Sequence, residues 1–61
     1  MAEYHVVPSA NQWRVQHKGG KVVSNHRKKA PAVKKAKKTA GSGDAVVIHR
    51  SNGTIQNRVS Y

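Results

Sequence analysis

The chain has 61 residues, enough for one small domain that buries only about 60% of the surface its unfolded form exposes. It contains no cysteine, which excludes a disulfide framework and a thiolate metal site and favours the cytoplasm as its compartment. Twelve Lys and Arg residues stand against two Asp and Glu, giving a formal net charge of +10, so we expect an anionic partner such as nucleic acid or an acidic protein.

Two strand-like runs open the chain and predict a hairpin over about residues 4–17. The runs extend from Tyr4 to Pro8 and from Gln12 to His17, and both are rich in β-branched and aromatic residues. A glycine-rich turn follows, and residues 21–24 can then supply a short third strand.

A lysine-rich segment comes next, and we expect an amphipathic helix over about residues 28–40. With about 100° between successive residues, four small or apolar side chains fall on one stripe: Ala32, Val33, Ala36 and Ala40. Gly41 stands where many helices end. No capping residue precedes the segment, so the helix should form only by docking on the sheet. The alternative is a disordered, histone-tail-like segment of Lys, Ala and Pro.

The last third of the chain predicts a second hairpin over about residues 45–60. Ala45 to His49 is a nearly continuous apolar run of strand length, and Asn52-Gly53 is the sequence preferred in a type I′ turn. The apolar run is far shorter than the roughly 20 residues that cross a bilayer. The apolar stripe of the basic helix is mostly alanine and offers little to insert into a lipid surface, so we expect no membrane partner.

These segments predict a single α+β domain over residues 1–61. We expect a small antiparallel sheet in β-β-β-α-β-β order, with the lysine-rich helix packed on one face. The expected core consists of Val6, Trp13, Val15, Val33, Ala36, Ala40, Val46, Ile48 and Ile55. The other face would present four polar or basic side chains: Arg14, Gln16, Gln56 and Arg58.

Several short motifs along the chain form a pattern that resembles the pattern of a known family. They are Tyr4 to Pro8 (YHVVP), Trp13, the alanines of the basic segment, Val47-Ile48-His49, Gly53 with Ile55, and the terminal Ser60-Tyr61. In this pattern the chain resembles a small bacterial family of unknown function. The resemblance implies the helix rather than a disordered tail, and it implies no particular activity.

The sequence departs from that family in its charge. Family members usually carry a Thr near the helix start and a mixture of Glu and basic residues along the helix, whereas Lys28 and Pro31 occupy such places here and the acids are missing. The fold therefore does not need the charge. We interpret the basic helix surface as an addition particular to this protein.

The basic helix favours a non-enzymatic module that binds duplex DNA or RNA. The candidate phosphate contacts are Arg27, Lys28, Lys29, Lys34, Lys35, Lys37 and Lys38. A second candidate surface combines Arg and Gln side chains that can hydrogen-bond to base edges: Arg14, Gln16, Gln56 and Arg58. The chain has only three aromatic residues to stack bases, which argues against a single-strand binding mode.

A protein-interaction or homodimeric assembly module is the alternative function. Exposed edge strands at Tyr4 to Pro8 or Thr54 to Val59 could pair with a second chain. The lysines would then be a solubility coat or would contact an acidic protein partner.

Four histidines raise the question of a metal or catalytic site: His5, His17, His26 and His49. No pair has the HxH or HxxxH spacing of metal ligands, and the only carboxylates are Glu3 and Asp44. We therefore expect no metal, no cofactor and no catalytic residue. His5 and His49 occupy similar points of two motifs, and we expect them to be neighbours.

Overall fold

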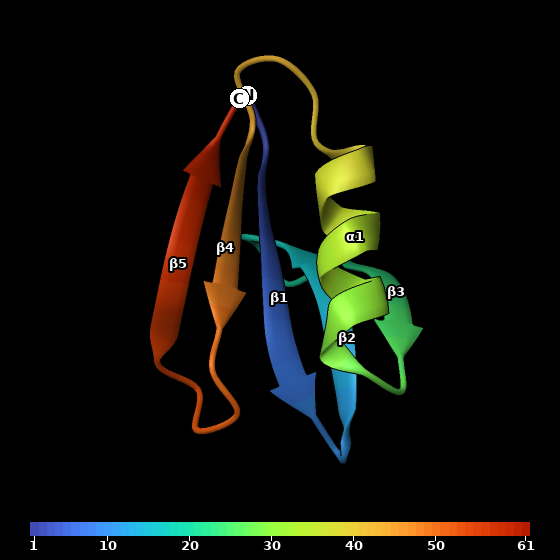
Figure 1. The fold of residues 1–61 in the computed structure, drawn as a ribbon. Coiled ribbons are helices and arrows are strands. Elements are labelled where there is room, and N and C mark those ends of the chain that lie inside the picture. Colours follow the sequence, from blue (N-terminus) through green and yellow to red (C-terminus); the bar gives the residue numbers. More distant parts are fainter.

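A computed structural model describes the full chain, residues 1–61, as one five-stranded sheet with a helix over part of one face (Figure 1). The elements are β1 (Glu3–Ser9), β2 (Gln12–His17), β3 (Val22–His26), α1 (Lys29–Thr39), β4 (Ala45–His49) and β5 (Ile55–Ser60). The α+β class and the predicted order of strands and helix are confirmed.

The sheet is mixed, whereas the sequence predicted an antiparallel one. Its strand order is β3-β2-β1-β4-β5, and the central pair β1 and β4 runs parallel, from Glu3 opposite Ala45 to Val6 opposite Ile48. The other three pairs are antiparallel. The parallel pair arises because α1 carries the chain from β3 back over the sheet, so that β4 enters beside β1 in the same direction (Figure 1).

The hydrophobic core lies between α1 and the sheet. Alternate residues of the central strands point toward the helix, and two alanines of α1 point back at them. The buried members of this layer are Tyr4, Val6, Val15, Ala32, Ala36, Val46 and Ile48. Ala32 and Ala36 have no exposed surface, because their small side chains let the helix lie close on the sheet. Trp13, Val33 and Ala40 pack at the edge of this cluster and are half-buried.

Ile55 was wrongly predicted to lie in the core, since 59% of its surface is exposed. A β-bulge between Ile48 and His49 explains the error. Asn57 pairs with Ile48, but Ile55 rather than Gln56 pairs with His49. The extra residue reverses the alternation of side chains along the start of β5, which places Ile55 on the open face and Gln56 on the helix side.

The tight hairpin turn is also not where the sequence predicted it. Ala10 and Asn11, between β1 and β2, both have positive φ (49° and 64°), as a two-residue type I′ turn requires. At Asn52-Gly53 only Gly53 has positive φ (90°), and the N–H of Gly53 donates to the carbonyl of Arg50. That connection is therefore a longer loop.

The two ends of α1 differ in how they are satisfied. Lys28, at the N-cap, makes no side-chain capping bond, and no acid lies in the first turn, as the sequence predicted. At the C-terminus Ala40 is extended and its N–H donates to the carbonyl of Ala36. Gly41 follows the end of the helix, as the sequence predicted, but it does not have the positive φ that is common in glycine at this position. The N–H of Gly41 instead donates to Oδ2 of Asp44 at 2.8 Å.

Candidate nucleic-acid interface

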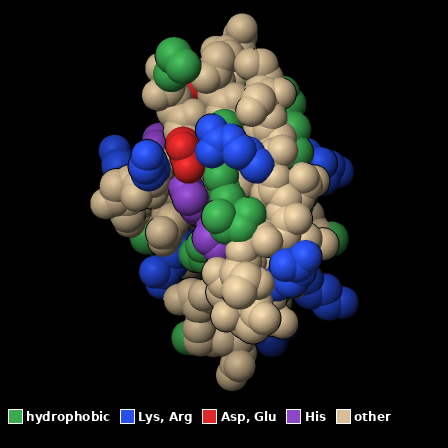
Figure 2. All heavy atoms as spheres, turned by 90° about the vertical axis from the view of Figure 1, so that its left-hand side faces the viewer, with side chains coloured by type: hydrophobic (Ala, Val, Ile, Leu, Met, Phe, Trp, Pro, Cys, Tyr) green, Lys and Arg blue, Asp and Glu red, His purple; other side chains and the backbone are tan.

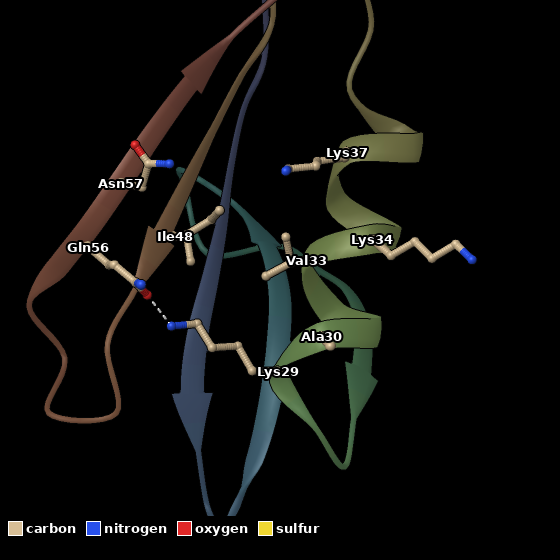
Figure 3. Close-up of a pocket in the computed structure, with 8 residues that line it drawn as sticks. All are labelled: Lys29, Ala30, Val33, Lys34, Lys37, Ile48, Gln56 and Asn57. Atoms are coloured by element: carbon tan, nitrogen blue, oxygen red, sulfur yellow. Dashed lines mark hydrogen bonds between the residues drawn. The ribbon is translucent and has the colours of Figure 1, made fainter.

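The basic side chains of α1 dominate the solvent-exposed surface of the helix. Lys34, Lys35, Lys37 and Lys38 are exposed, as are Arg27 and Lys28 just before the helix. Lys34 points away from the sheet, whereas Lys29 and Lys37 point toward β4 and β5 (Figure 3). The cations therefore surround the exposed part of the helix rather than forming one flat face.

Lys29 differs from the other lysines because it is half-buried. Its Nζ donates to Oε1 of Gln56 on β5 and lies 5.1 Å from the ring centroid of Trp13 on β2. A cation over an aromatic face is stabilised by the ring quadrupole. Lys29 thus ties the start of the helix to both halves of the sheet.

No acidic side chain neutralises the helix. Ion pairs occur only between Glu3 and His5 and between Glu3 and Arg58, and neither involves a residue of α1. The other carboxylate, Asp44, accepts hydrogen bonds from the backbone N–H groups of Ala2 and Gly41, which hold the pKa of Asp44 below its usual value. Both acids are engaged elsewhere, so the positive charge of α1 faces solvent uncompensated.

A groove of about 670 Å³ lies between α1 and β5 (Figure 3). It exists because the helix packs mainly over β1, β2 and β3, reaches only part of β4 and does not pack against β5. The lining residues are Lys29, Ala30, Val33, Lys34, Lys37, Ile48, Gln56 and Asn57. The groove therefore combines an aliphatic floor with lysines on the helix side and amides on the strand side.

The four residues of the second candidate surface do not all lie on one face of the sheet. Arg14, Gln16 and Arg58 lie on the open face of the sheet, but Gln56 lies on the helix side because of the bulge in β5. Nε of Arg14 donates to Oδ1 of Asn25 at 3.3 Å, and Nη1 of Arg58 lies 3.6 Å from Oε1 of Glu3. Both guanidinium groups already have partners within the protein, which makes this face the weaker candidate for binding an anion.

A chain of hydrogen bonds crosses the open face. Oε1 of Glu3 lies 2.9 Å from Nε2 of His5, and Nδ1 of His5 lies 3.0 Å from Nε2 of His49. Nδ1 of His49 in turn donates to the carbonyl of Gly53 at 3.0 Å. Figure 2 shows carboxylate and histidine side chains in contact on this side of the molecule, with Lys or Arg side chains around them.

The expected proximity of His5 and His49 is thus confirmed, while the role of Glu3 was not anticipated. The signal was present in the sequence, because Glu3 and His5 are two residues apart on one strand and so share a face. The three side chains form a line rather than surrounding a common point, and no group of three His, Asp or Glu residues has the arrangement of a metal site. The line joins β1, β4 and the loop after β4.

The comparisons with known proteins bear on the family and not on the activity. A family model described as "Uncharacterized protein conserved in bacteria (DUF2188)" matches residues 4–61. The chain belongs to this family. No curated protein and no solved structure shows a significant match to the chain. The one helix of this family member is neither long nor apolar enough to cross a membrane.

Proposed function

We propose that this protein is a non-enzymatic nucleic-acid-binding module that contacts the phosphate backbone of duplex DNA or RNA through α1. The observation that supports this most is the set of exposed lysines on a helix whose orientation is fixed by the buried Ala32 and Ala36. No acid competes for these lysines. A nucleic-acid partner also accounts for a net charge of +10 on so small a body. A cytoplasmic location is part of this proposal.

Binding of this kind is electrostatic and carries little sequence information. Each phosphate that a lysine neutralises releases condensed counterions, so affinity falls steeply as salt rises. With about six phosphates contacted, the slope of log K against log salt would be about −5. The helix carries no Asn or Gln to hydrogen-bond to bases, so α1 supplies affinity rather than specificity.

Interaction with another protein is a second candidate function. Ile55 on β5 and Val22 on β3 expose 59% and 45% of their surface, and these strands are the two edges of the sheet. An exposed apolar residue on an edge strand is typical of a surface that pairs with a second chain. A homodimer would use these edges, whereas an acidic partner would contact the lysines of α1. Light scattering would detect the dimer directly.

A matched pair of charge-reversal variants tests the proposal. In the first variant Lys34, Lys35 and Lys38 are replaced by Glu, and in the second the same change is made at Lys18, Lys21 and Arg50, which lie outside the helix. Both lower the net charge equally. We expect the helix variant to lose duplex affinity on the order of 100-fold in fluorescence anisotropy and the control to lose far less. Equal losses would mean that only the overall charge matters, and retained binding by both would contradict the proposal.

A further inference from the structure

The polar groups that line the groove between α1 and β5 share one chemical property. Oε1 of Gln56 is occupied by Nζ of Lys29, and Oδ1 of Asn57 accepts the backbone N–H of Arg58 at 2.9 Å. The amide nitrogens of both residues remain as donors, and the amide nitrogen of Asn57 points toward the helix (Figure 3). Together with the ammonium groups of Lys29 and Lys37, the groove therefore offers donors and no free side-chain acceptor.

The floor of the groove is apolar. Val33 of α1 and Ile48 of β4 lie side by side between the two polar walls (Figure 3). Lys29 and Lys37 are eight residues apart on the helix, which separates their Cα atoms by about 12 Å along its axis. A ligand that fills this groove must combine hydrogen-bond acceptors, negative charge at two well-separated points and a flat apolar surface.

We propose that the groove binds an unpaired base that adjoins the bound duplex, with phosphates of the same strand at Lys29 and Lys37. The base would cover Val33 and Ile48 with its apolar face and accept hydrogen bonds from the amide nitrogens of Gln56 and Asn57. Thymine suits the donor-only lining because its exocyclic groups are carbonyl acceptors. This inference rests on the proposed function and adds to it a preference for a duplex end or junction over a continuous duplex.

A paired base cannot cover the apolar floor of the groove. In a continuous duplex the base faces are stacked, and only the base edges and the sugar-phosphate backbone are accessible to the protein, so the floor at Val33 and Ile48 would stay unfilled. An aliphatic floor stabilises a bound base less than an aromatic side chain that stacks on it does. We therefore expect the groove to hold a single base rather than a run of stacked bases.

An acidic peptide fits the groove less well. A peptide bound beside β5 would add a strand through the free backbone groups of that edge. The N–H of Arg58, one of the backbone groups of this strand, already has Oδ1 of Asn57 as its partner. At Arg58 the edge is therefore less open to strand addition than at Ile55, the exposed residue near the other end of β5.

The test compares three DNA probes that share one short duplex: a blunt duplex, the duplex with a single-stranded thymidine overhang, and the duplex with an abasic overhang of equal length. The two overhangs carry the same phosphates and differ only in the bases. We expect the unaltered protein to bind the thymidine probe about tenfold more tightly than the abasic probe, a difference of about 1.4 kcal/mol.

Two isosteric variants locate the effect. Asn57→Asp replaces a donor in the groove with an acceptor, and Asn25→Asp makes the same charge change on the open face, where Asn25 accepts from Arg14. We expect the thymidine advantage to vanish in Asn57→Asp and to persist in Asn25→Asp. Far-UV circular dichroism confirms that both variants are folded.

The remaining outcomes separate the two proposals. Equal binding of the thymidine and abasic probes by the unaltered protein overturns this inference and leaves the proposed function standing. A thymidine advantage that persists in Asn57→Asp also overturns it, because the base is then bound elsewhere. Failure to bind any probe, with binding of an acidic peptide instead, overturns both the inference and the proposed function.

Discussion

Nδ1 of His5 and Nε2 of His49 lie 3.0 Å apart across the parallel strands β1 and β4. Their outer nitrogens face acceptors, the carboxylate of Glu3 and the carbonyl of Gly53. Three hydrogen bonds therefore need three protons on four ring nitrogens, one more than two neutral imidazoles carry. The intact line corresponds to one positive charge shared by the pair, next to the negative charge of Glu3.

This proton count can be checked directly. Long-range proton–nitrogen NMR spectra at mildly acidic pH, above the titration of Glu3, are expected to show three protonated ring nitrogens in His5 and His49 together. Two protonated nitrogens in the unaltered protein would mean that one of the three hydrogen bonds is not formed.

The folded state is expected to lose stability in acid through Glu3. Partial burial acts to raise the pKa of Glu3, but the hydrogen bond with His5 and the charges of Arg58 and Lys18 outweigh it and hold that pKa below the usual value. A carboxylate with a depressed folded pKa stabilises the fold above its unfolded pKa, and this contribution is lost as the pH falls through the folded pKa.

Urea denaturation at a series of pH values measures this contribution. We expect the free energy of unfolding of the unaltered protein to fall below about pH 4.5, and the profile of Glu3→Gln to be flatter over the same range. Asp44, whose pKa is also lowered, keeps its own contribution in both proteins. Parallel profiles for the two proteins would show that Glu3 does not contribute.

Ala10 is a strained position whose replacement should stabilise the protein. Its φ of 49° lies in the left-handed region, where an alanine side chain is disfavoured and glycine is not. We expect Ala10→Gly to raise the free energy of unfolding by about 0.5–1 kcal/mol. The control Ala30→Gly, at an exposed position in the first turn of α1, should lower it by up to about 1 kcal/mol, the cost of glycine in a helix interior. A loss of stability at both positions would contradict the turn geometry.

The contact between α1 and the sheet depends on small side chains. Ala36 has no exposed surface, so Ala36→Leu would push the helix away from the sheet and is expected to cost about 1–3 kcal/mol. Ala30→Leu adds the same atoms on the exposed side, and leucine and alanine have similar helix propensities, so that change should be close to neutral. Thermal unfolding measures the stability of the two variants. Equal losses of stability would mean that Ala36 does not set the distance between α1 and the sheet.

The alternation of apolar residues was enough to predict the order of elements and the burial of Val6, Val15 and Val46, because side-chain parity within one strand is a local property. It failed for Ile55 and Gln56, since the bulge opposite His49 depends on how two strands are paired and leaves no mark in the alternation of either strand. The direction of β4 relative to β1 is likewise a property of the connection through α1.

The candidate site was predictable only in part. The lysines of α1 were visible as a charge pattern, and their exposure follows from the alanine stripe. The groove was not predictable, because it results from the lateral position of α1 on the sheet and from the shift of Gln56 to the helix side. Both depend on tertiary packing rather than on the residues themselves.

The most direct test of the central proposal is a two-dimensional amide NMR titration of the protein with a short mixed-sequence DNA duplex at two salt concentrations. We predict shift changes concentrated in residues 27–38 that become much smaller at the higher salt. Spectra that do not respond to the duplex at low salt, or changes confined to the open face around Arg14 and Arg58, would contradict binding through α1.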